Sequence, residues 1–400
     1  MNLATPTWIA GLLVTGMGVA LLGSVKIPLA RRLQIDEARV GALVSMFGFA
    51  MIPVMLVMGF LTDLLDKQAV VVAGSLLIVA SLVLLSRSGR YWHALVAVLL
   101  LSAGWSALIN VLNVMMEAAF GGLPTYHMNL GNFFFGLGAF LTPLVIAYLL
   151  QRAGYTWAVL VWAVPALLVG VFALFVDFAG LLAALEKAAE ATGSARAQAA
   201  NLGIGALLVD PIMWLTALAL LFYAPMEATM AAWATTYLGD KGLSEGRAFT
   251  LLSGFWLAFM GSRLATALLV AAFPLPAGGD TTLIIVLSVL CLLVWAGAVF
   301  SPGGATAGAM VILAGLVFGP TFPTIIGVLV GHVNADLSPD LGGRAVGLFF
   351  AIGGIGWSVI PMLIGAYAQK RGVQQGFRIA AGAAAGLLVM ALALHFTVAP

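Results

Sequence analysis

The chain has 400 residues, of which 63% are hydrophobic and only 8% are charged, and its formal net charge is +2. A soluble domain carries about 25% charged residues, so this composition excludes a water-soluble globule and indicates a chain that lies mostly in lipid. The small net charge and the lack of an arginine-rich stripe exclude nucleic acid as a partner, and the single cysteine, Cys291, excludes an intrachain disulfide framework.

Apolar stretches long enough to cross a bilayer, about 20 residues each, recur along the whole chain. They predict twelve membrane-spanning helices, with the approximate bounds 8–30, 39–62, 69–86, 92–119, 128–151, 155–178, 208–238, 248–271, 280–300, 305–330, 343–368 and 376–397. The N-terminal MNLATPTW has no basic residue, so we expect the first span to be retained and not cleaved as a secretory signal.

One longer connection, 179–204, separates the first six spans from the last six. It is rich in alanine and carries Glu186, Lys187, Glu190 and Arg196, which predicts a polar or amphipathic connector. We therefore expect an N-terminal half of 1–178, a cytoplasmic connector of 179–205 and a C-terminal half of 206–400.

The two halves carry one matched feature. A glycine and a proline stand five residues apart in the fifth span, Gly138 and Pro143, and again in the eleventh span, Gly356 and Pro361. Repeated halves with a central substrate site are a common transporter design, although glycine and proline are frequent in membrane helices in general.

Polar side chains in the fourth span follow one helical stripe: Ser106, Asn110, Asn113 and Glu117. Lipid cannot satisfy two amides and a carboxyl group, so we expect the stripe to face a neighbouring helix or a watery cavity. The alternative is that these residues only hold helices together by hydrogen bonds.

The fifth span begins with two amides one turn apart, Asn129 and Asn132, followed by the aromatic run Phe133 to Phe135. Amides that bind hydroxyl groups beside rings that cover an apolar face suit a sugar. Aromatic core packing is the alternative explanation for the phenylalanines.

The seventh span carries a carboxyl group near the middle of the bilayer. Asp210-Pro211 predicts the start of this helix, and Glu227 follows Tyr223 by one turn, with Pro225 between them removing a backbone hydrogen bond. An ion at this depth costs about 2.5–3.5 kcal/mol on insertion scales, so intramembrane carboxyls are usually functional. A carboxyl that is neutral when dry and charged when wetted suits a proton-coupled carrier.

The end of the second span, Gly59-Phe-Leu-Thr-Asp63-Leu-Leu-Asp66-Lys67, resembles the loop motif of the major facilitator superfamily. Gly59, Leu61, Asp63 and Lys67 fit that motif, whereas Leu64, Asp66 and Gln68 depart from it. Gly261-Ser-Arg263, at the close of the eighth span, resembles the counterpart in the second half. The resemblance implies that Gly59, Asp63, Lys67 and Arg263 control conformational gating.

Within that superfamily the chain is most similar to the fucose-permease branch of sugar symporters. Four stretches carry the similarity: MNLGNFFFGLGAFLTPL (128–144), YAPMEATMAAWATTYL (223–238), GFWLAFMGSR (254–263) and FGPTFPTIIG (318–327). Two acidic positions of the branch read here as Ser24 and Ser106, which leaves Glu227 as the main intramembrane carboxyl.

This resemblance implies an all-α integral membrane protein with twelve transmembrane helices in two six-helix halves, the major facilitator fold. It implies a secondary transporter of a small polar solute, a sugar, working by alternating access. The expected substrate-binding residues are Asn110, Asn113, Asn129, Asn132, Tyr223, Glu227, Trp233 and Trp256, with Glu227 also coupling to H⁺ or Na⁺.

We expect no catalytic residues, no metal site and no cofactor, and a monomer in the plasma (inner) membrane with both termini cytoplasmic. The charge distribution opposes this orientation, because most basic residues then fall on the non-cytoplasmic side, which the positive-inside rule disfavours. They are Arg31, Arg32, Arg39, Arg87, Arg90, Arg152, Lys241, Arg247, Lys370, Arg371 and Arg378.

The same sequence also fits other functions. A uniporter or an exporter of another small organic solute fits the same residues, and so does a receptor or scaffold that has lost transport. A polytopic enzyme would need two aspartate-rich loops, for which Asp336 with Asp340 and Asp63 with Asp66 are the candidates.

Overall fold

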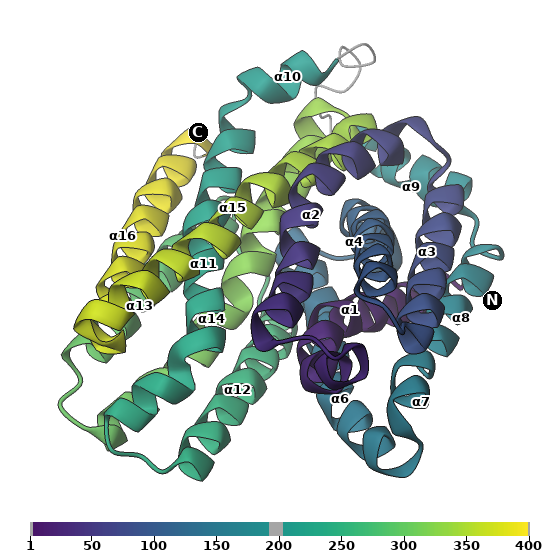
Figure 1. The fold of residues 1–400 in the computed structure, drawn as a ribbon. Coiled ribbons are helices and arrows are strands. Elements are labelled where there is room, and N and C mark those ends of the chain that lie inside the picture. Colours follow the sequence, from purple (N-terminus) through teal and green to yellow (C-terminus); the bar gives the residue numbers. More distant parts are fainter. Residues whose placement is uncertain (1–2, 192–202, 399–400) are drawn as a thin grey trace. The chain divides into compact units, whose positions relative to one another are not determined.

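The computed structural model describes residues 3–191 and 203–398, and every regular element among them is a helix (Figure 1). Twelve of these segments are long and apolar enough to cross a membrane. The predicted all-helical membrane fold with twelve spans is therefore confirmed.

The helices of the first half follow the predicted order. Their bounds are α1 Ala4–Leu33, α2 Glu37–Leu64, α3 Lys67–Arg87, α4 Tyr91–Val114, α5 Met116–Phe120, α6 Pro124–Arg152, α7 Gly154–Leu160, α8 Ala163–Ala173 and α9 Phe178–Ala191. Together α7 and α8 make up the sixth span.

The second half starts with a short helix and continues with six long ones. Their bounds are α10 Ile204–Val209, α11 Pro211–Asp240, α12 Glu245–Ala272, α13 Gly279–Phe300, α14 Gly304–His332, α15 Gly342–Arg371 and α16 Val373–Val398. A π-turn, η2 Val333–Leu337, and a 3₁₀ turn, η3 Pro339–Leu341, connect α14 to α15.

The chain forms two compact units. The first unit comprises 1–121, 131–204 and 333–351, and the second comprises 122–130, 205–332 and 352–400. Each unit is thus built mainly from one half of the sequence, while α6 and α15 each contribute residues to both.

The two matched glycines make equivalent contacts within their own units. A Cβ on Gly138 of α6 would lie 2.1 Å from the carbonyl oxygen of Leu13 in α1, and one on Gly356 of α15 would lie 2.2 Å from that of Leu221 in α11. Only glycine allows these helices to approach so closely. In each half the fifth helix of the set packs on the first, as an internal repeat requires.

The fourth span is shorter than predicted. The helix α4 ends at Val114, and Met115 adopts φ −107° and ψ 21°, which turns α5 out of line with α4. The expected stripe therefore stops at Asn113, and Glu117 belongs to a separate helix.

The sixth span also differs from the prediction, because it ends at Ala173 and a new helix begins at Phe178. Asp177 starts this helix by accepting a hydrogen bond from the backbone N–H of Gly180 at 2.9 Å. The predicted connector thus opens as the helix α9, while residues 192–202, including Arg196, lie outside the described residues.

Candidate functional site

The expected substrate-binding residues divide between the two units. Asn110, Asn113 and Asn132 belong to the first unit, whereas Asn129, Tyr223, Glu227, Trp233 and Trp256 belong to the second. All three residues of the first set are buried, at 5% exposure or less.

The helix α11 begins where the sequence predicts and brings Tyr223 and Glu227 onto one face. The side chain of Asp210 caps it by accepting a hydrogen bond from the Met213 N–H at 2.7 Å, and Pro211 occupies the first turn. Pro225 cannot donate to the carbonyl of Leu221, which leaves that oxygen facing Gly356.

Tyr223 is the centre of a polar cluster in the second unit. Its fully buried hydroxyl oxygen lies 2.9 Å from Oε2 of Glu227 and 2.8 Å from the carbonyl oxygen of Phe318 in α14. The ring of Phe318 packs edge-on against the ring of Tyr223, with 6.5 Å between their centroids. The hydroxyl therefore links α11 to α14 in the interior of the unit.

Arg263 supplies a positive charge to this cluster. The motif predicts this residue at the close of the eighth span, but it lies well inside α12 and is only 2% exposed. Its Nε donates to the carbonyl oxygen of Gly319 at 2.8 Å, its guanidinium lies 4.1 Å from the centroid of the Phe259 ring, and its charge interacts with Glu227.

A proline makes the acceptor of Arg263 available. In a regular helix the carbonyl of Gly319 would bond the N–H four residues later, but that residue is Pro323, which has none. The stretch FGPTFPTIIG thus supplies a free backbone oxygen at membrane depth. The glycine-proline spacing was visible in the sequence, whereas its partner was not.

The two predicted tryptophans lie in the same unit in different surroundings. Trp256 is half-buried in α12, and its ring packs edge-on against Phe259 at 5.5 Å, next to Arg263. Trp233 lies against Gly365 of α15, where a Cβ would come within 2.9 Å of its ring.

The buried amides have oxygen atoms without partners. Asn110 donates to the carbonyl oxygen of Gly343 at 3.0 Å, Asn113 to that of Ile109 at 2.7 Å, and Asn129 to that of Thr125 at 2.9 Å. Within the described part of the chain, no donor meets the Oδ1 atom of any of these three asparagines. Buried oxygen atoms without a donor are uncommon and can accept bonds from water or from a ligand.

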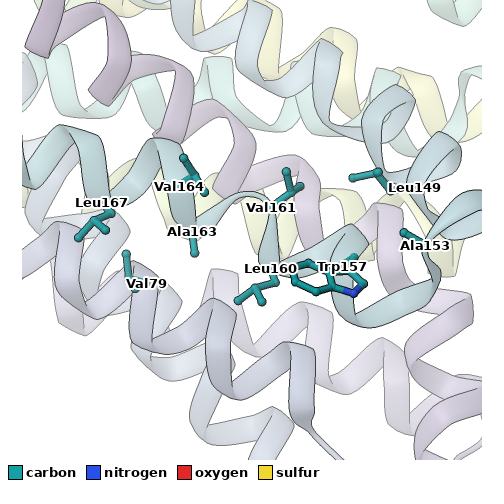
Figure 2. A pocket seen from close by; sticks show the side chains of 9 residues that line it. All are labelled: Val79, Leu149, Ala153, Trp157, Leu160, Val161, Ala163, Val164 and Leu167. Carbon is teal, nitrogen blue, oxygen red and sulfur yellow. The ribbon is translucent and has the colours of Figure 1, made fainter.

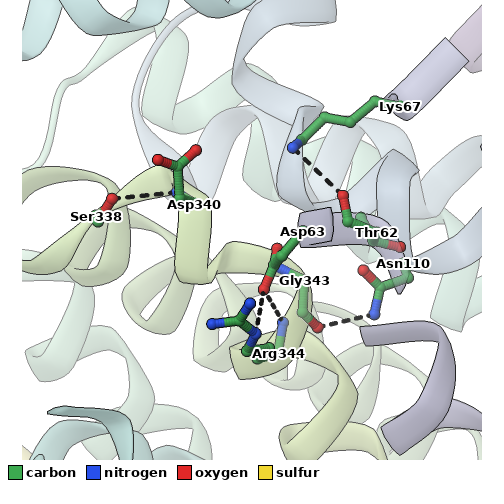
Figure 3. Close-up of polar contacts among 8 residues, drawn as sticks. All are labelled: Thr62, Asp63, Lys67, Asn110, Ser338, Asp340, Gly343 and Arg344. Carbon is green, nitrogen blue, oxygen red and sulfur yellow. Dashed lines mark hydrogen bonds and ion pairs between the residues drawn. The ribbon is translucent and has the colours of Figure 1, made fainter. Parts of the chain in front are cut away.

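The end of α2 holds the beginning of α15 through Asp63 (Figure 3). Its carboxylate, which is fully buried, accepts hydrogen bonds from the backbone N–H groups of Gly343 at 2.7 Å and Arg344 at 2.9 Å. The guanidinium Nε of Arg344 lies 3.4 Å from the same carboxylate. Asp63 thus satisfies two N–H groups of the first turn of α15, where the helix dipole also favours a negative charge.

Glycine and lysine complete this contact. A Cβ on Gly59 would lie 2.6 Å from the carbonyl oxygen of Gly343, so the two helices meet at their backbones. The buried ammonium of Lys67 lies 3.5 Å from the carbonyl oxygen of Thr62 at the end of α2. Every residue of this contact belongs to the first unit.

Two carboxyl groups outside the spans have perturbed pKa values. Burial alone raises the pKa of Asp210, but hydrogen bonds from His332, at 2.9 Å, and from Met213 outweigh burial, so its pKa lies below the ordinary 3.8. Burial raises the pKa of Glu117 above its ordinary 4.5, and the nearby Asn334 amide offsets only part of this effect. The contact of His332 with Asp210 had no signal in the sequence.

The aspartates that an enzyme would need in two acidic loops lie in unrelated surroundings. Asp336 and Asp340 are exposed on the turns before α15, and Asp63 is occupied by the α15 backbone. Among the described residues, no group of three His, Cys, Asp or Glu side chains could hold a metal ion.

The family model of the major facilitator superfamily matches residues 8–341. The chain belongs to the major facilitator superfamily. Since this is a family of membrane transporters, the chain is an integral, multi-pass membrane transporter by family and by fold.

Solved structures of this superfamily share the fold. The E. coli fucose:proton symporter FucP is 16% identical with a TM-score of 0.76, over 98% of this chain and 99% of that one. The proton:xylose symporter XylE is 12% identical with a TM-score of 0.76, over 100% and 95%. The human organic anion transporter MFSD10 is 15% identical with a TM-score of 0.71, over 97% and 99%. The comparison with curated proteins gives no match.

Proposed function

We propose that this protein is a secondary active transporter that moves a small polar solute, a sugar, by alternating access. The observation that carries the proposal is the cluster of the buried Tyr223 and Arg263 with the half-buried Glu227, inside helices that cross the membrane. Charged groups at this depth are costly and are retained mainly where they bind or move something.

A sugar also fits the polar and aromatic groups that each unit offers by itself. Hydroxyl groups would donate to the Oδ1 atoms of Asn110, Asn113 and Asn129, which have no donor among the described residues. The half-buried ring of Trp256 would cover an apolar sugar face, with Trp233 and Asn132 as further binding residues. The fucose and xylose symporters among the structural relatives support the same substrate class.

The number of protons available for the hydrogen bonds of Tyr223 favours H⁺ as the coupling ion. The Tyr223 hydroxyl has one proton, yet its oxygen lies within hydrogen-bond distance of two acceptors, the Glu227 carboxyl and the Phe318 carbonyl. Both contacts are hydrogen bonds when Glu227 carries a proton, because its carboxyl then donates to Tyr223 while Tyr223 donates to Phe318. The positive charge of Arg263 beside Glu227 disfavours Na⁺ at the same place.

Loss of the proton would rearrange the cluster. An ionised Glu227 cannot donate, so the Tyr223 hydroxyl would turn to it and release the carbonyl of Phe318. Proton binding at Glu227 would thereby decide whether α11 is bonded to α14 through Tyr223. Such a two-state contact is the kind of element that can couple an ion to a conformational change.

We assign gating to Gly59, Asp63 and Lys67, where the end of α2 holds the first turn of α15. For Arg263 the contacts with Gly319 and Glu227 favour a role in the ion and substrate site instead. We further propose that the protein works as a monomer in the inner membrane with both termini cytoplasmic.

A second candidate function is transport of a small organic anion. It rests on the buried guanidinium of Arg263, which is well suited to bind a carboxylate, and an organic anion transporter is among the structural relatives.

Uptake into proteoliposomes separates these possibilities. We expect a proton gradient, inside alkaline, to drive accumulation of a labelled neutral sugar, and a sodium gradient to have no effect. Accumulation of sugar acids but not of neutral sugars would favour the organic anion function. No accumulation of any solute from a broad panel, with or without gradients, would overturn the transporter proposal.

A further inference from the structure

The first unit has an apolar cavity of about 480 Å³ on its exposed surface (Figure 2). Nine residues line it: Val79, Leu149, Ala153, Trp157, Leu160, Val161, Ala163, Val164 and Leu167. Three of these side chains are largely exposed, namely Trp157 at 60%, Val164 at 59% and Leu167 at 47%. We call this cavity the α7/α8 groove.

A proline explains why the surface is hollowed here. Pro165 has no N–H for the carbonyl of Val161, and its ring would clash with that carbonyl in a straight helix. The sixth span is accordingly interrupted between Leu160 and Ala163, with α7 and α8 on either side. The interruption lies between lining residues of the groove.

One end of the groove lies next to basic residues in the chain. Trp157, Ala153 and Leu149 gather at that end, and Arg152 precedes Ala153 in the chain (Figure 2). The start of α7 is joined to the end of α3, because the hydroxyls of Tyr155 and Thr156 donate to the carbonyls of Leu85 and Ser86 at 3.3 and 3.2 Å.

Arginines therefore collect beside this end. Arg87 ends α3 and is exposed, Arg152 ends α6 and is exposed, and the guanidinium of Arg32 lies 5.2 Å from the Tyr155 ring. In the described part of the chain, neither Arg87 nor Arg152 is paired with an acidic side chain. Unpaired, exposed guanidinium groups of this kind are well suited to bind a phosphate.

The groove is long enough to cross one lipid leaflet. From Ala153 to Leu167 the chain advances at most about 21 Å, at roughly 1.5 Å per helical residue. Half of a hydrocarbon core is about 15 Å. Since Arg152 and Gly154 lie at the ends of two spans, the basic end falls at headgroup level and Leu167 falls near the midplane. An exposed tryptophan at the headgroup level is also typical of membrane proteins.

We propose that the α7/α8 groove binds one anionic phospholipid, with an acyl chain along Trp157, Leu160 and Leu167 and the phosphate at Arg87 and Arg152. The apolar groove gives the site its affinity for a chain, and the two arginines select a negatively charged headgroup over a zwitterionic one.

Native mass spectrometry of the full-length protein tests this proposal, with phosphatidylglycerol and phosphatidylcholine as competing probes. We expect the wild type to retain phosphatidylglycerol about tenfold better than phosphatidylcholine, a preference that corresponds to about 1.4 kcal/mol. The double variant Arg87→Gln/Arg152→Gln should bind both lipids equally, and Ala163→Trp, which fills the groove, should bind neither tightly.

The matched control is Lys370→Gln/Arg371→Gln, which removes two exposed basic side chains at the end of α15. It should keep the preference, because these residues belong to the second unit. Unchanged selectivity in Arg87→Gln/Arg152→Gln would overturn the proposal, even if Ala163→Trp failed to fold. Equal binding of both lipids by the wild type, or a protein dimer that Ala163→Trp abolishes, would also overturn it.

Discussion

Glu227 is hydrogen-bonded to the hydroxyl group of Tyr223 and interacts electrostatically with the guanidinium group of Arg263. Tyr223 precedes it by one turn of α11, whereas Arg263 comes from α12. A carboxyl in this position has two low-cost arrangements, one protonated and bonded to Tyr223 and one ionised beside Arg263. Burial of Tyr223 and Arg263 strengthens the electrostatic difference between the two arrangements.

We predict that Glu227→Gln separates binding from coupling. The glutamine amide can donate to Tyr223 as the protonated carboxyl does, but it cannot release a proton. Solute binding and exchange should persist, while accumulation driven by a proton gradient should fall about tenfold or more, the effect of losing 1.4 kcal/mol of coupling.

Counterflow and gradient-driven uptake in proteoliposomes measure the two properties separately. Glu245→Gln is a suitable control, since it makes the same substitution at an exposed residue in the first turn of α12, outside the cluster. Unchanged accumulation by Glu227→Gln, with the same pH dependence as the wild type, would show that Glu227 is not the coupling residue.

We predict from the raised pKa of Glu117 that the free energy of unfolding depends on pH. Because burial raises its pKa in the folded state, the folded protein binds this proton more tightly than the unfolded chain. The resulting stabilisation is fully present below the ordinary value of 4.5 and is lost as the pH rises through the folded-state pKa.

Glu117→Gln should remove this dependence. Its melting temperature should match that of the wild type at pH 4 and exceed it increasingly toward pH 7, because the amide stays neutral. Melting curves in detergent at several pH values measure the difference. If the difference in melting temperature between Glu117→Gln and the wild type does not change with pH, the pKa of Glu117 is not raised in the folded protein.

At the scale of elements, proline and glycine determine which helices touch. Pro323 frees the carbonyl that Arg263 binds, and Pro225 frees the carbonyl that faces Gly356. Gly59 lets α2 meet α15 at the backbone, so that Asp63 reaches the first turn. Each contact pairs a helix end or a helix break with a group from another helix.

We predict that Asp63→Asn loosens the first turn of α15. The asparagine offers one acceptor oxygen where the carboxylate offers two, and it loses the charge that interacts with Arg344 and the helix dipole. A lost cap costs about 1 kcal/mol, so amide exchange in 342–351 should accelerate about fivefold.

Hydrogen exchange followed by peptide mass spectrometry measures this rate. Asp66→Asn is the matched control, because Asp66 caps its own helix α3 through the N–H of Ala69. It should affect the start of α3 and leave 342–351 unchanged. Equal protection of 342–351 in Asp63→Asn and the wild type would show that the carboxylate does not hold α15.

At the scale of the whole molecule, the basic residues conflict with the orientation expected from the family. In that orientation Arg32, Arg87 and Arg152 would lie on the non-cytoplasmic side, and they are the arginines near the Trp157 end of the α7/α8 groove. A lipid-binding role gives these charges a reason to lie there that is independent of membrane insertion.

Single-cysteine labelling in intact cells tests the orientation. Cys291 is the only cysteine and is fully buried, so Cys291→Ser removes the background at little cost. In that chain, Gln151→Cys should react with an impermeant maleimide, and Lys187→Cys should react only after permeabilisation; both positions are exposed. The opposite pattern would reverse the proposed orientation.

The sequence by itself determined the membrane class, the twelve spans and the superfamily, and it drew attention to Asp63 and Glu227, whose roles stay predictions. These features depend on local properties, namely the length of apolar runs, proline and glycine positions, and motif spacing. The break after Val114 and the separate helix α9 escaped prediction, because continuous hydropathy conceals a change of backbone direction.

Only the tertiary structure decided which groups meet. It brought Arg263 to Gly319 and the Glu227 cluster, Asp63 to a helix that starts almost 280 residues later, and α3 to α7 around the groove. The members of each pair lie far apart along the chain, and no local sequence pattern indicates that they meet. Helix packing selects them, and it does so through backbone contacts that a sequence does not display.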